Sequence, residues 1–278
     1  MPALHIIALV KWVPDAQLER HFTDGQLLNR AEGILGELDE YPLEAALQIK
    51  EELQKNNDDA AVRVSALTMG PAGASAAVKK ALQIGADDGY HLSDEALRGA
   101  DIWASAAALA VAARHVLDTA EFADDAEFLI LTGMVSDDGE SGALPAQLAE
   151  RLGVPALTQA TGLRLELDTD TDTSRLVVTR ISGDRLQKVA APLPAVVSVT
   201  DQANQPRYPN FKAIMAAKKK PVTSFDLAEL GLTGTAVESK LRMVSADPRP
   251  ARAAGEIITD DGEAGARIVD FLAKERLL

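Results

Sequence analysis

The first half of the chain alternates short apolar runs with longer segments whose apolar positions recur at helical spacing. His5 to Val10 and Val62 to Met69 are apolar on both faces, as expected of buried parallel strands. Leu43 to Leu53 and Ala74 to Ile84 are apolar mainly on one side, which predicts amphipathic helices. The alternation continues with a strand at Asp88–Leu92, a helix from Asp101 to about Leu117, a strand from Phe128 to Gly133 and a helix at Leu144–Leu152.

This order predicts an α/β fold, in which a mostly parallel sheet carries helices on both faces. After Pro155 the pattern changes to strands with polar turns between them. We therefore expect a β-hairpin insertion over about residues 160–191, after which Ala195 to Val199 returns to the buried sheet. The acidic stretch Asp168 to Asp172 lacks the glycine and the terminal glutamate of a calcium loop, so we interpret it as a solvated turn.

The last part of the chain is predicted to be an arm. We place the main domain at residues 1–220 and the C-terminal arm at 221–278. Within the arm we expect a short helix at Asp226–Leu230 and a closing helix in Thr259–Leu278, whose apolar face includes Phe271. An arm this apolar must pack either on its own body or on a partner chain.

Composition excludes several kinds of site. With no cysteine, the chain has no disulfide, thiolate zinc site, iron–sulfur cluster or cysteine nucleophile, and the four scattered histidines show no metal-ligand spacing. A net charge of −14 argues against nucleic acid as a partner. The apolar run near the start is too short to span a bilayer, and no basic segment precedes it, so we expect a cytoplasmic protein without membrane insertion.

Three loops at the ends of predicted strands are the candidate binding site. Parallel sheets bind ligands at the carboxyl ends of their strands, which nominates residues 11–15, 69–73 and 133–142. In the third loop, small residues allow close approach of the backbone, and a helix follows whose free N–H groups suit a phosphate. Ser136 and Ser141 can add hydroxyl donors, and Asp138 can accept bonds from loop amides or from a ribose. A small-residue connection without a ligand is the alternative.

Lys11 follows the first strand, where a phosphate partner or simple extension to the surface would each explain it. No Walker loop follows a strand, and no G-x-G-x-x-G motif follows the first one. We also find no catalytic triad, so the residues predict no bond-breaking chemistry.

The segment Asn204 to Lys220 joins a turn rich in proline and asparagine to a helix that ends in three lysines. Lysines suit the negative end of a helix dipole, so simple capping is one interpretation. On an acidic protein they also form a docking patch for an acidic partner.

Several motifs resemble those of electron-transferring flavoprotein β subunits. They include Asn204-Gln205-Pro206-Arg207-Tyr208-Pro209, the helix end at residues 214–220, and Leu193 to Val199 before them. Matches continue at Val10-Lys11, Gly85-Ala86-Asp87, Gly142-Ala143-Leu144-Pro145 and Ser239-Lys240-Leu241, so the resemblance covers nearly the whole chain. The short loop at residues 136–142 is similar to the FixA type of this family.

The resemblance implies a Rossmann-like body of the adenine nucleotide alpha-hydrolase-like kind, without catalytic residues of its own. It implies a heterodimer with an α subunit that holds most of an FAD, and electron transfer from acyl-CoA-type dehydrogenases to a quinone oxidoreductase. It also implies a structural AMP in this chain. By position the cofactor-binding residues correspond to Leu9, Lys11, Gly36, Asp39, Met69, Gly70, Gly133, Met134, Ser136, Asp137, Asp138, Gly139, Ser141, Gly142 and Ala143.

The same resemblance assigns partner docking to a second group of residues. They are Ala203, Asn204, Pro206, Arg207, Tyr208, Lys218, Lys219 and Lys220. Family members often have leucine where this chain has Ala203, and some have a flavin-contacting aromatic near Ala16, which is absent here. The arm at 221–278 is expected to pack on the α subunit.

Two alternatives remain at this point. A bifurcating form of the family would hold a second FAD in place of AMP. An ATP-using enzyme of the same fold would need a Ser-Gly-Gly-x-Asp-Ser type loop after the first strand, where this chain has Lys11-Trp12-Val13-Pro14.

Overall fold

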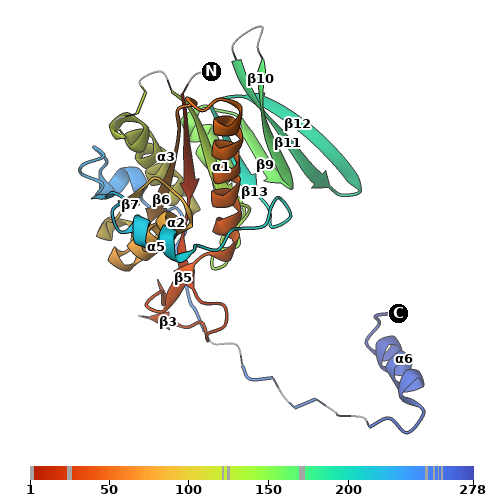
Figure 1. Ribbon diagram of the computed structural model, residues 1–278. Helices are drawn as coiled ribbons and strands as arrows, with labels where there is room; N and C mark the ends of the chain where they lie inside the picture. Colours follow the sequence, from red (N-terminus) through yellow and green to blue (C-terminus); the bar gives the residue numbers. More distant parts are fainter. Residues whose placement is uncertain are drawn as a thin grey trace. The chain divides into compact units, whose positions relative to one another are not determined.

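The computed structural model describes residues 3–23, 27–120, 122–123, 126–168, 173–247, 250–252, 254–255, 257 and 259–278. It divides into two compact units, Met1–Ser245 and Ala246–Leu278. The first unit contains every sheet of the described chain (Figure 1).

The centre of the first unit is a seven-stranded sheet in the order β14-β7-β6-β1-β8-β13-β9, in which every neighbouring pair is parallel. This confirms the predicted α/β fold class. The strands are β1 (Leu4–Leu9), β6 (Val62–Met69), β7 (Asp88–Leu92), β8 (Glu127–Gly133), β9 (Ala156–Ala160), β13 (Ala195–Val199) and β14 (Val222–Phe225).

Helices cover both faces of this sheet (Figure 1). The side chains of β1 alternate between two apolar clusters, with Ile6 and Ala8 in one and Ile7 and Leu9 in the other. The first cluster includes buried residues of α1 (Glu37–Asn56) and α2 (Ser75–Ile84), and the second those of α3 (Ile102–Thr119) and α4 (Leu144–Leu152). Burial on both faces is why the central strands are mostly apolar.

Residues of the predicted hairpin insertion form a separate three-stranded antiparallel sheet. Its strands are β10 (Gly162–Asp168), β11 (Thr173–Ser182) and β12 (Arg185–Pro192). Leu176 and Val178 point from β11 into the main core, which anchors this sheet to the body. Residues 169–172, within the predicted acidic turn, lie outside the described residues.

The second half of the chain departs from the predicted pattern at several points. β9 and β14 were not predicted as strands, and residues 227–231 form a turn where a short helix was expected. The compact unit extends to Ser245, beyond the boundary predicted at residue 220, because β14 adds an edge strand beside β7. The closing helix is α6 (Ala264–Lys274), shorter than the predicted segment.

The remaining elements are short connections. Two small antiparallel pairs lie between β1 and α1, and further short helices follow β6, β7, β13 and β14. They are β2 (Trp12–Pro14) with β5 (Gly33–Leu35), β3 (Phe22–Thr23) with β4 (Leu27–Leu28), η1 (Ala72–Ala74), η2 (Glu95–Leu97), α5 (Phe211–Ala217) and η3 (Gly234–Val237).

Candidate functional site

A cavity of about 450 Å³ lies at the carboxyl ends of β1, β6 and β8. β1 stands between β6 and β8, so the chain order reverses direction at this point of the sheet. Ligands of open α/β sheets bind at such a switch point. The cavity is lined by Leu9, Val10, Lys11, Arg30, Asp39, Leu67, Met69, Ala100, Asp101, Ile102, Ser105, Leu109, Thr132, Gly133, Met134, Val135, Ser136, Gly139, Ser141, Gly142, Leu144, Pro145 and Leu241.

Most of the residues predicted to bind a cofactor line this cavity. They are Leu9, Lys11, Asp39, Met69, Gly133, Met134, Ser136, Gly139, Ser141 and Gly142. The other five do not line it: Asp138 is bonded to a lining residue, whereas Gly36, Gly70, Asp137 and Ala143 lie in the adjoining segments. The structure therefore brings together the three strand-end loops that the sequence nominated, and the binding roles of these residues remain predictions.

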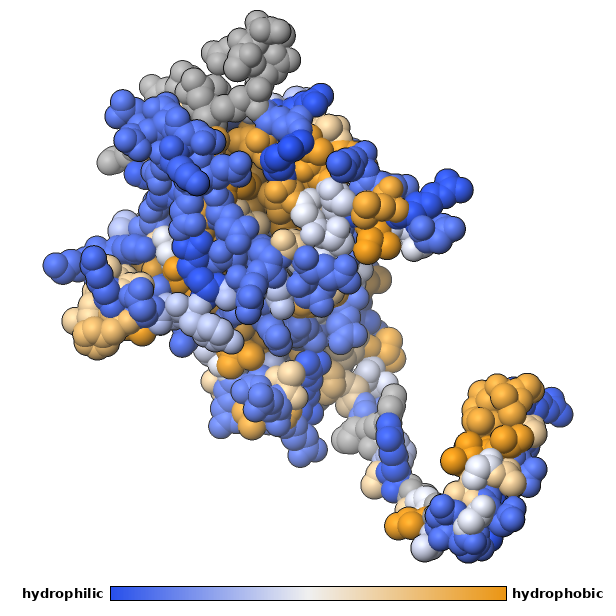
Figure 2. Space-filling view, turned by 45° about the vertical axis from the view of Figure 1, so that its right-hand side comes forward, coloured by the Kyte–Doolittle hydropathy of each residue, from blue (hydrophilic) through white to orange (hydrophobic). Residues whose placement is uncertain are grey.

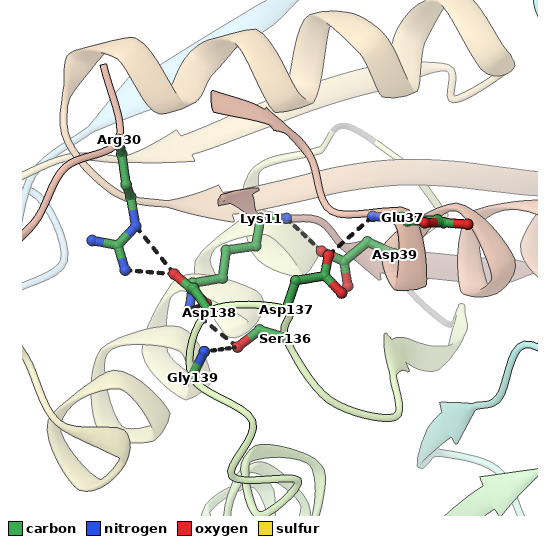
Figure 3. A network of polar contacts seen from close by, with 8 residues as sticks. All are labelled: Lys11, Arg30, Glu37, Asp39, Ser136, Asp137, Asp138 and Gly139. Atoms are coloured by element: carbon green, nitrogen blue, oxygen red, sulfur yellow. Dashed lines mark hydrogen bonds and ion pairs between the residues drawn. The ribbon is translucent and has the colours of Figure 1, made fainter. Parts of the chain in front are cut away.

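The buried carboxylate of Asp138 forms an ion cluster beside the cavity with the partly exposed side chains of Lys11 and Arg30 (Figure 3). The Asp138 carboxylate accepts from Lys11 Nζ at 2.7 Å and from Arg30 Nη2 at 2.5 Å, while the Asp138 side chain is 1% exposed. Burial alone would raise the pKa of Asp138, but the Lys11 ammonium and the Arg30 guanidinium outweigh burial and lower the pKa to about 2. The carboxylate therefore stays charged and holds both cations at the edge of the cavity.

Asp39 is the second carboxyl group of the site, at the first turn of α1. One oxygen accepts from the backbone N–H of Lys11 at 2.8 Å (Figure 3). Burial raises the pKa of Asp39 to about 7, and the Lys11 contacts only partly oppose that increase. Asp39 therefore changes its charge near neutral pH, whereas Asp138 does not.

Gly133 allows β8 and α1 to approach each other at the cavity. A Cβ at this position would lie 2.8 Å from Asp39 Oδ1 and 2.8 Å from the backbone oxygen of Leu38. The Leu38 oxygen has no helical N–H donor four residues later, because that residue is Pro42. The glycine is therefore required by packing rather than by an unusual dihedral angle.

The loop after β8 reaches the N-terminus of α1 on one side and that of α4 on the other. Asp137 accepts from the backbone N–H of Glu37 at 3.2 Å, and Ser136 Oγ accepts from that of Gly139 at 3.2 Å (Figure 3). The first turn of α4 has no side-chain cap, because its N-cap residue is Ala143. Uncapped N–H groups beside a cavity suit an anion such as a phosphate.

Some lining residues were missed by the sequence reasoning. Asp101 and Ile102 begin α3, and Asp101 was predicted only as the helix cap. The strand-end rule would have included this loop had it been applied to β7. Arg30 carried no signal, and Leu241 was noted only as part of a family motif, because the place of both residues in the cavity depends on long-range contacts.

The predicted docking segment is partly engaged within the chain itself. Arg207 binds Glu44 with Nε–Oε2 at 2.7 Å and Glu51 with Nη1–Oε1 at 2.5 Å, both on α1. Lys220 Nζ donates to the carbonyl oxygens of Leu82, Gly85 and Ala86 at the end of α2. Tyr208, Lys218 and Lys219 remain exposed.

In the part of the chain that the structure describes, no group of three or more histidine, aspartate or glutamate side chains is placed to hold a metal ion. The parallel sheet with helices on both faces and a cavity at its switch point place the chain in the Rossmann-like class of α/β proteins, in which nucleotides commonly bind at this position.

Comparison with known proteins identifies the family. The model of the electron transfer flavoprotein domain matches residues 25–230. The electron transfer flavoprotein β subunit of Mycobacterium tuberculosis is 39% identical over 280 residues, which cover 99% of each chain, and that of Mycobacterium leprae is 40% identical over 281 residues. The caffeyl-CoA reductase–Etf complex subunit CarD of Acetobacterium woodii is 29% identical, over 99% of this chain and all of the relative.

The chain belongs to the electron transfer flavoprotein family, in which it is a β subunit. Membership confirms the resemblance found in the sequence, and it implies an electron carrier with a bound flavin nucleotide and an α subunit as partner. Among the described residues, no helix has the length and apolar character needed to cross a membrane.

Proposed function

We propose that this chain is the non-catalytic half of a heterodimer that carries electrons from acyl-CoA and related dehydrogenases to a quinone oxidoreductase. The α subunit holds most of the FAD that carries the electrons. The cavity at the switch point of this chain holds an AMP, whose role is structural. The nucleotide assignment rests on the cavity, which is flanked by the uncapped N-terminus of α4 and by the Lys11 and Arg30 side chains bound to Asp138.

The lining of the cavity fits the chemistry of AMP. A phosphate suits the first turn of α4 and the hydroxyl groups of Ser136 and Ser141, with Lys11 supplying positive charge nearby. Apolar side chains such as Leu9, Leu67 and Leu109 suit the flat faces of a purine base. A volume of about 450 Å³ lies within the range of ordinary small-ligand sites.

Docking of dehydrogenases is proposed for the exposed part of residues 203–220. Tyr208 is 93% exposed, and Phe211, the first residue of α5, is 78% exposed. Lys218 and Lys219, which follow the end of α5, are also exposed. Aromatic side chains beside positive charges suit an acidic partner surface. The contacts of Arg207 and Lys220 within the chain support a role for these two residues in shaping the surface.

The nucleotide content of the purified heterodimer tests the proposal. Released nucleotides should be one FAD and one AMP per heterodimer, identified by chromatography and mass. The Gly142→Val variant should lower the AMP content, because Gly142 has φ of +61° at the cavity and a β-branched side chain strains that conformation.

Gly153→Val is the matched control for that variant. Gly153 has φ of +71° and ends α4, so the substitution adds similar strain at the far end of the same helix. It should cost stability but leave the AMP content unchanged. Equal AMP in both variants and the wild type would contradict the placement of the site.

A second FAD in place of AMP is the second candidate. The similarity to a subunit of a caffeyl-CoA reductase–Etf complex favours testing it. Because FAD contains an AMP moiety, the same cavity would hold its adenine half. Two FAD and no AMP per heterodimer would support this candidate over the first.

A further inference from the structure

The tail segment Ser239–Leu241, which we call the strap, crosses the start of α3 and reaches the cavity. Leu241 lines the cavity although it is 72% exposed. An exposed leucine at the rim of a cavity contributes little to the core of the chain itself. Its position is therefore better explained by something that occupies the cavity.

Asp101 holds the strap through one side-chain oxygen and its backbone N–H, while its other side-chain oxygen caps α3. Oδ1 caps α3 by accepting from the N–H of Ala104 at 2.8 Å. Oδ2 accepts from the N–H groups of Lys240 at 2.6 Å and Leu241 at 2.8 Å. The backbone N–H of Asp101 donates to Ser239 Oγ at 2.9 Å. Four hydrogen bonds thus converge on one residue at the cavity wall.

We propose that the strap is a lid on the nucleotide cavity, in which Leu241 contacts the bound nucleotide and Asp101 is the positioning residue that holds the lid. The proposal rests on the nucleotide binding proposed above. Leu241 covers apolar surface of the ligand beside the start of α3, where Ile102 lines the wall. Backbone bonds already formed to Asp101 reduce the entropy cost of ordering the strap when the nucleotide binds.

Asp101→Asn separates the two roles of this side chain. Asparagine is as good an N-cap as aspartate, so its amide oxygen keeps the bond to Ala104 and the helix start. Its NH₂ group then faces the N–H groups of Lys240 and Leu241, which have no acceptor left. The strap is released while α3 remains capped.

Asp94→Asn is the matched control. Asp94 also caps a helix, η2, by accepting from Ala96 N at 2.8 Å, and its second oxygen accepts from Leu227 N at 3.1 Å. Like Asp101, Asp94 therefore caps a helix with one oxygen and binds a backbone N–H far along the chain with the other. Asp94 does not line the cavity.

A second pair of variants tests the ligand contact without changing any hydrogen bond. Leu241→Ser removes the apolar side chain at the rim. Val244→Ser removes the apolar side chain of an 84% exposed residue three positions further along, outside the lining.

The measurement is the release rate of AMP from the purified heterodimer, followed by exchange with isotope-labelled AMP, together with hydrogen exchange of the Lys240 and Leu241 amides. Asp101→Asn and Leu241→Ser should each release AMP about tenfold faster, the factor expected for one lost net contact. Asp101→Asn should also expose the two amides to exchange. Both controls should release AMP at the wild-type rate.

Two distinguishable results would refute the proposal that the strap is a lid. Unchanged release in both test variants would refute the strap while leaving the nucleotide site intact. A wild-type heterodimer that contains no adenine nucleotide in this chain would refute the proposed function itself, and the lid with it.

Discussion

At the scale of single residues, the site depends on two carboxyl groups whose surroundings separate their pKa values. Asp138 stays charged because two cations bind it, and Asp39 titrates near neutral pH because burial dominates. The positive charges of Lys11 and Arg30 are therefore held in place, while Asp39 at the start of α1 is not permanently negative. Such an arrangement favours an anionic ligand over a cationic one.

Gly133→Ala should destabilise the chain and distort the cavity. The added Cβ would lie 2.8 Å from the backbone oxygen of Leu38, which cannot move without shifting α1. We expect a loss of about 2 kcal/mol in the free energy of unfolding, measured by urea denaturation. Gly73→Ala is the control, because a Cβ there meets no atom within 4 Å. Equal stability of the two variants would contradict the close approach.

His5 should make the free energy of unfolding of the chain depend on pH. Burial, helped by the charge of Arg63, lowers the pKa of His5 from 6.5 to about 4, and its ring binds Ser65 Oγ at 2.7 Å. Between these two pH values the unfolded chain binds a proton that the folded chain does not. Stability therefore falls as the pH falls from 6.5 to 4, by up to about 1.4 kcal/mol per pH unit.

Comparison of the wild type with His5→Gln in urea at about pH 7 and about pH 4.5 measures this contribution. The wild type should lose about 2 kcal/mol more than the variant over that interval. His21→Gln, at an exposed histidine, should behave as the wild type does. An equal loss in wild type and His5→Gln would show that another group is responsible.

At the scale of elements, α1 joins the cavity to the predicted docking segment. Its first turn carries Asp39 into the cavity. Further along, the backbone oxygen of Tyr41 accepts from Asn204 Nδ2 at 2.9 Å, and Glu44 and Glu51 bind Arg207. Two residues of the family-like motif therefore hold the turn against α1, and the exposed Tyr208 is presented between them and α5.

Arg207→Gln should loosen this turn and destabilise the chain. Glu44 is 4% exposed, so loss of its partner leaves a buried charge without a counterion. We expect a cost of about 3 kcal/mol in urea denaturation and faster hydrogen exchange in residues 201–209. Arg185→Gln is the control, since the side chain of Arg185 is 82% exposed. A variant that weakened dehydrogenase binding at unchanged stability would instead assign Arg207 to direct docking.

At the scale of the whole molecule, the chain consists of a body and a separate terminal unit. Apolar side chains gather on α6 within that unit (Figure 2). Ile268, Val269 and Phe271 are each more than half exposed, and no residue of the helix is buried. An apolar helix face of this kind must be covered by another protein surface, and packing of the arm on the α subunit stays a prediction.

Truncation after Ser245 should separate folding from association. Because the body contains both apolar clusters, the shortened chain should keep the unfolding midpoint of the full chain. It should lose stable association with the α subunit in size-exclusion chromatography. In the full chain, Ile268→Ser with Phe271→Ser should weaken association similarly, whereas Lys274→Gln should not. Retained association of the truncated chain would refute the role of the arm.

The sequence by itself determined the parallel α/β body, because residues buried on both faces of a sheet must be apolar runs such as His5 to Val10. It also determined the family and the three loops that line the cavity, since the ends of the apolar strand runs are visible locally. Tertiary structure alone decided that Asp138 binds Lys11 and Arg30, that Arg207 faces α1, and that Leu241 reaches the cavity. These pairs are far apart in the chain, and no local periodicity records which distant charge or side chain will come into contact.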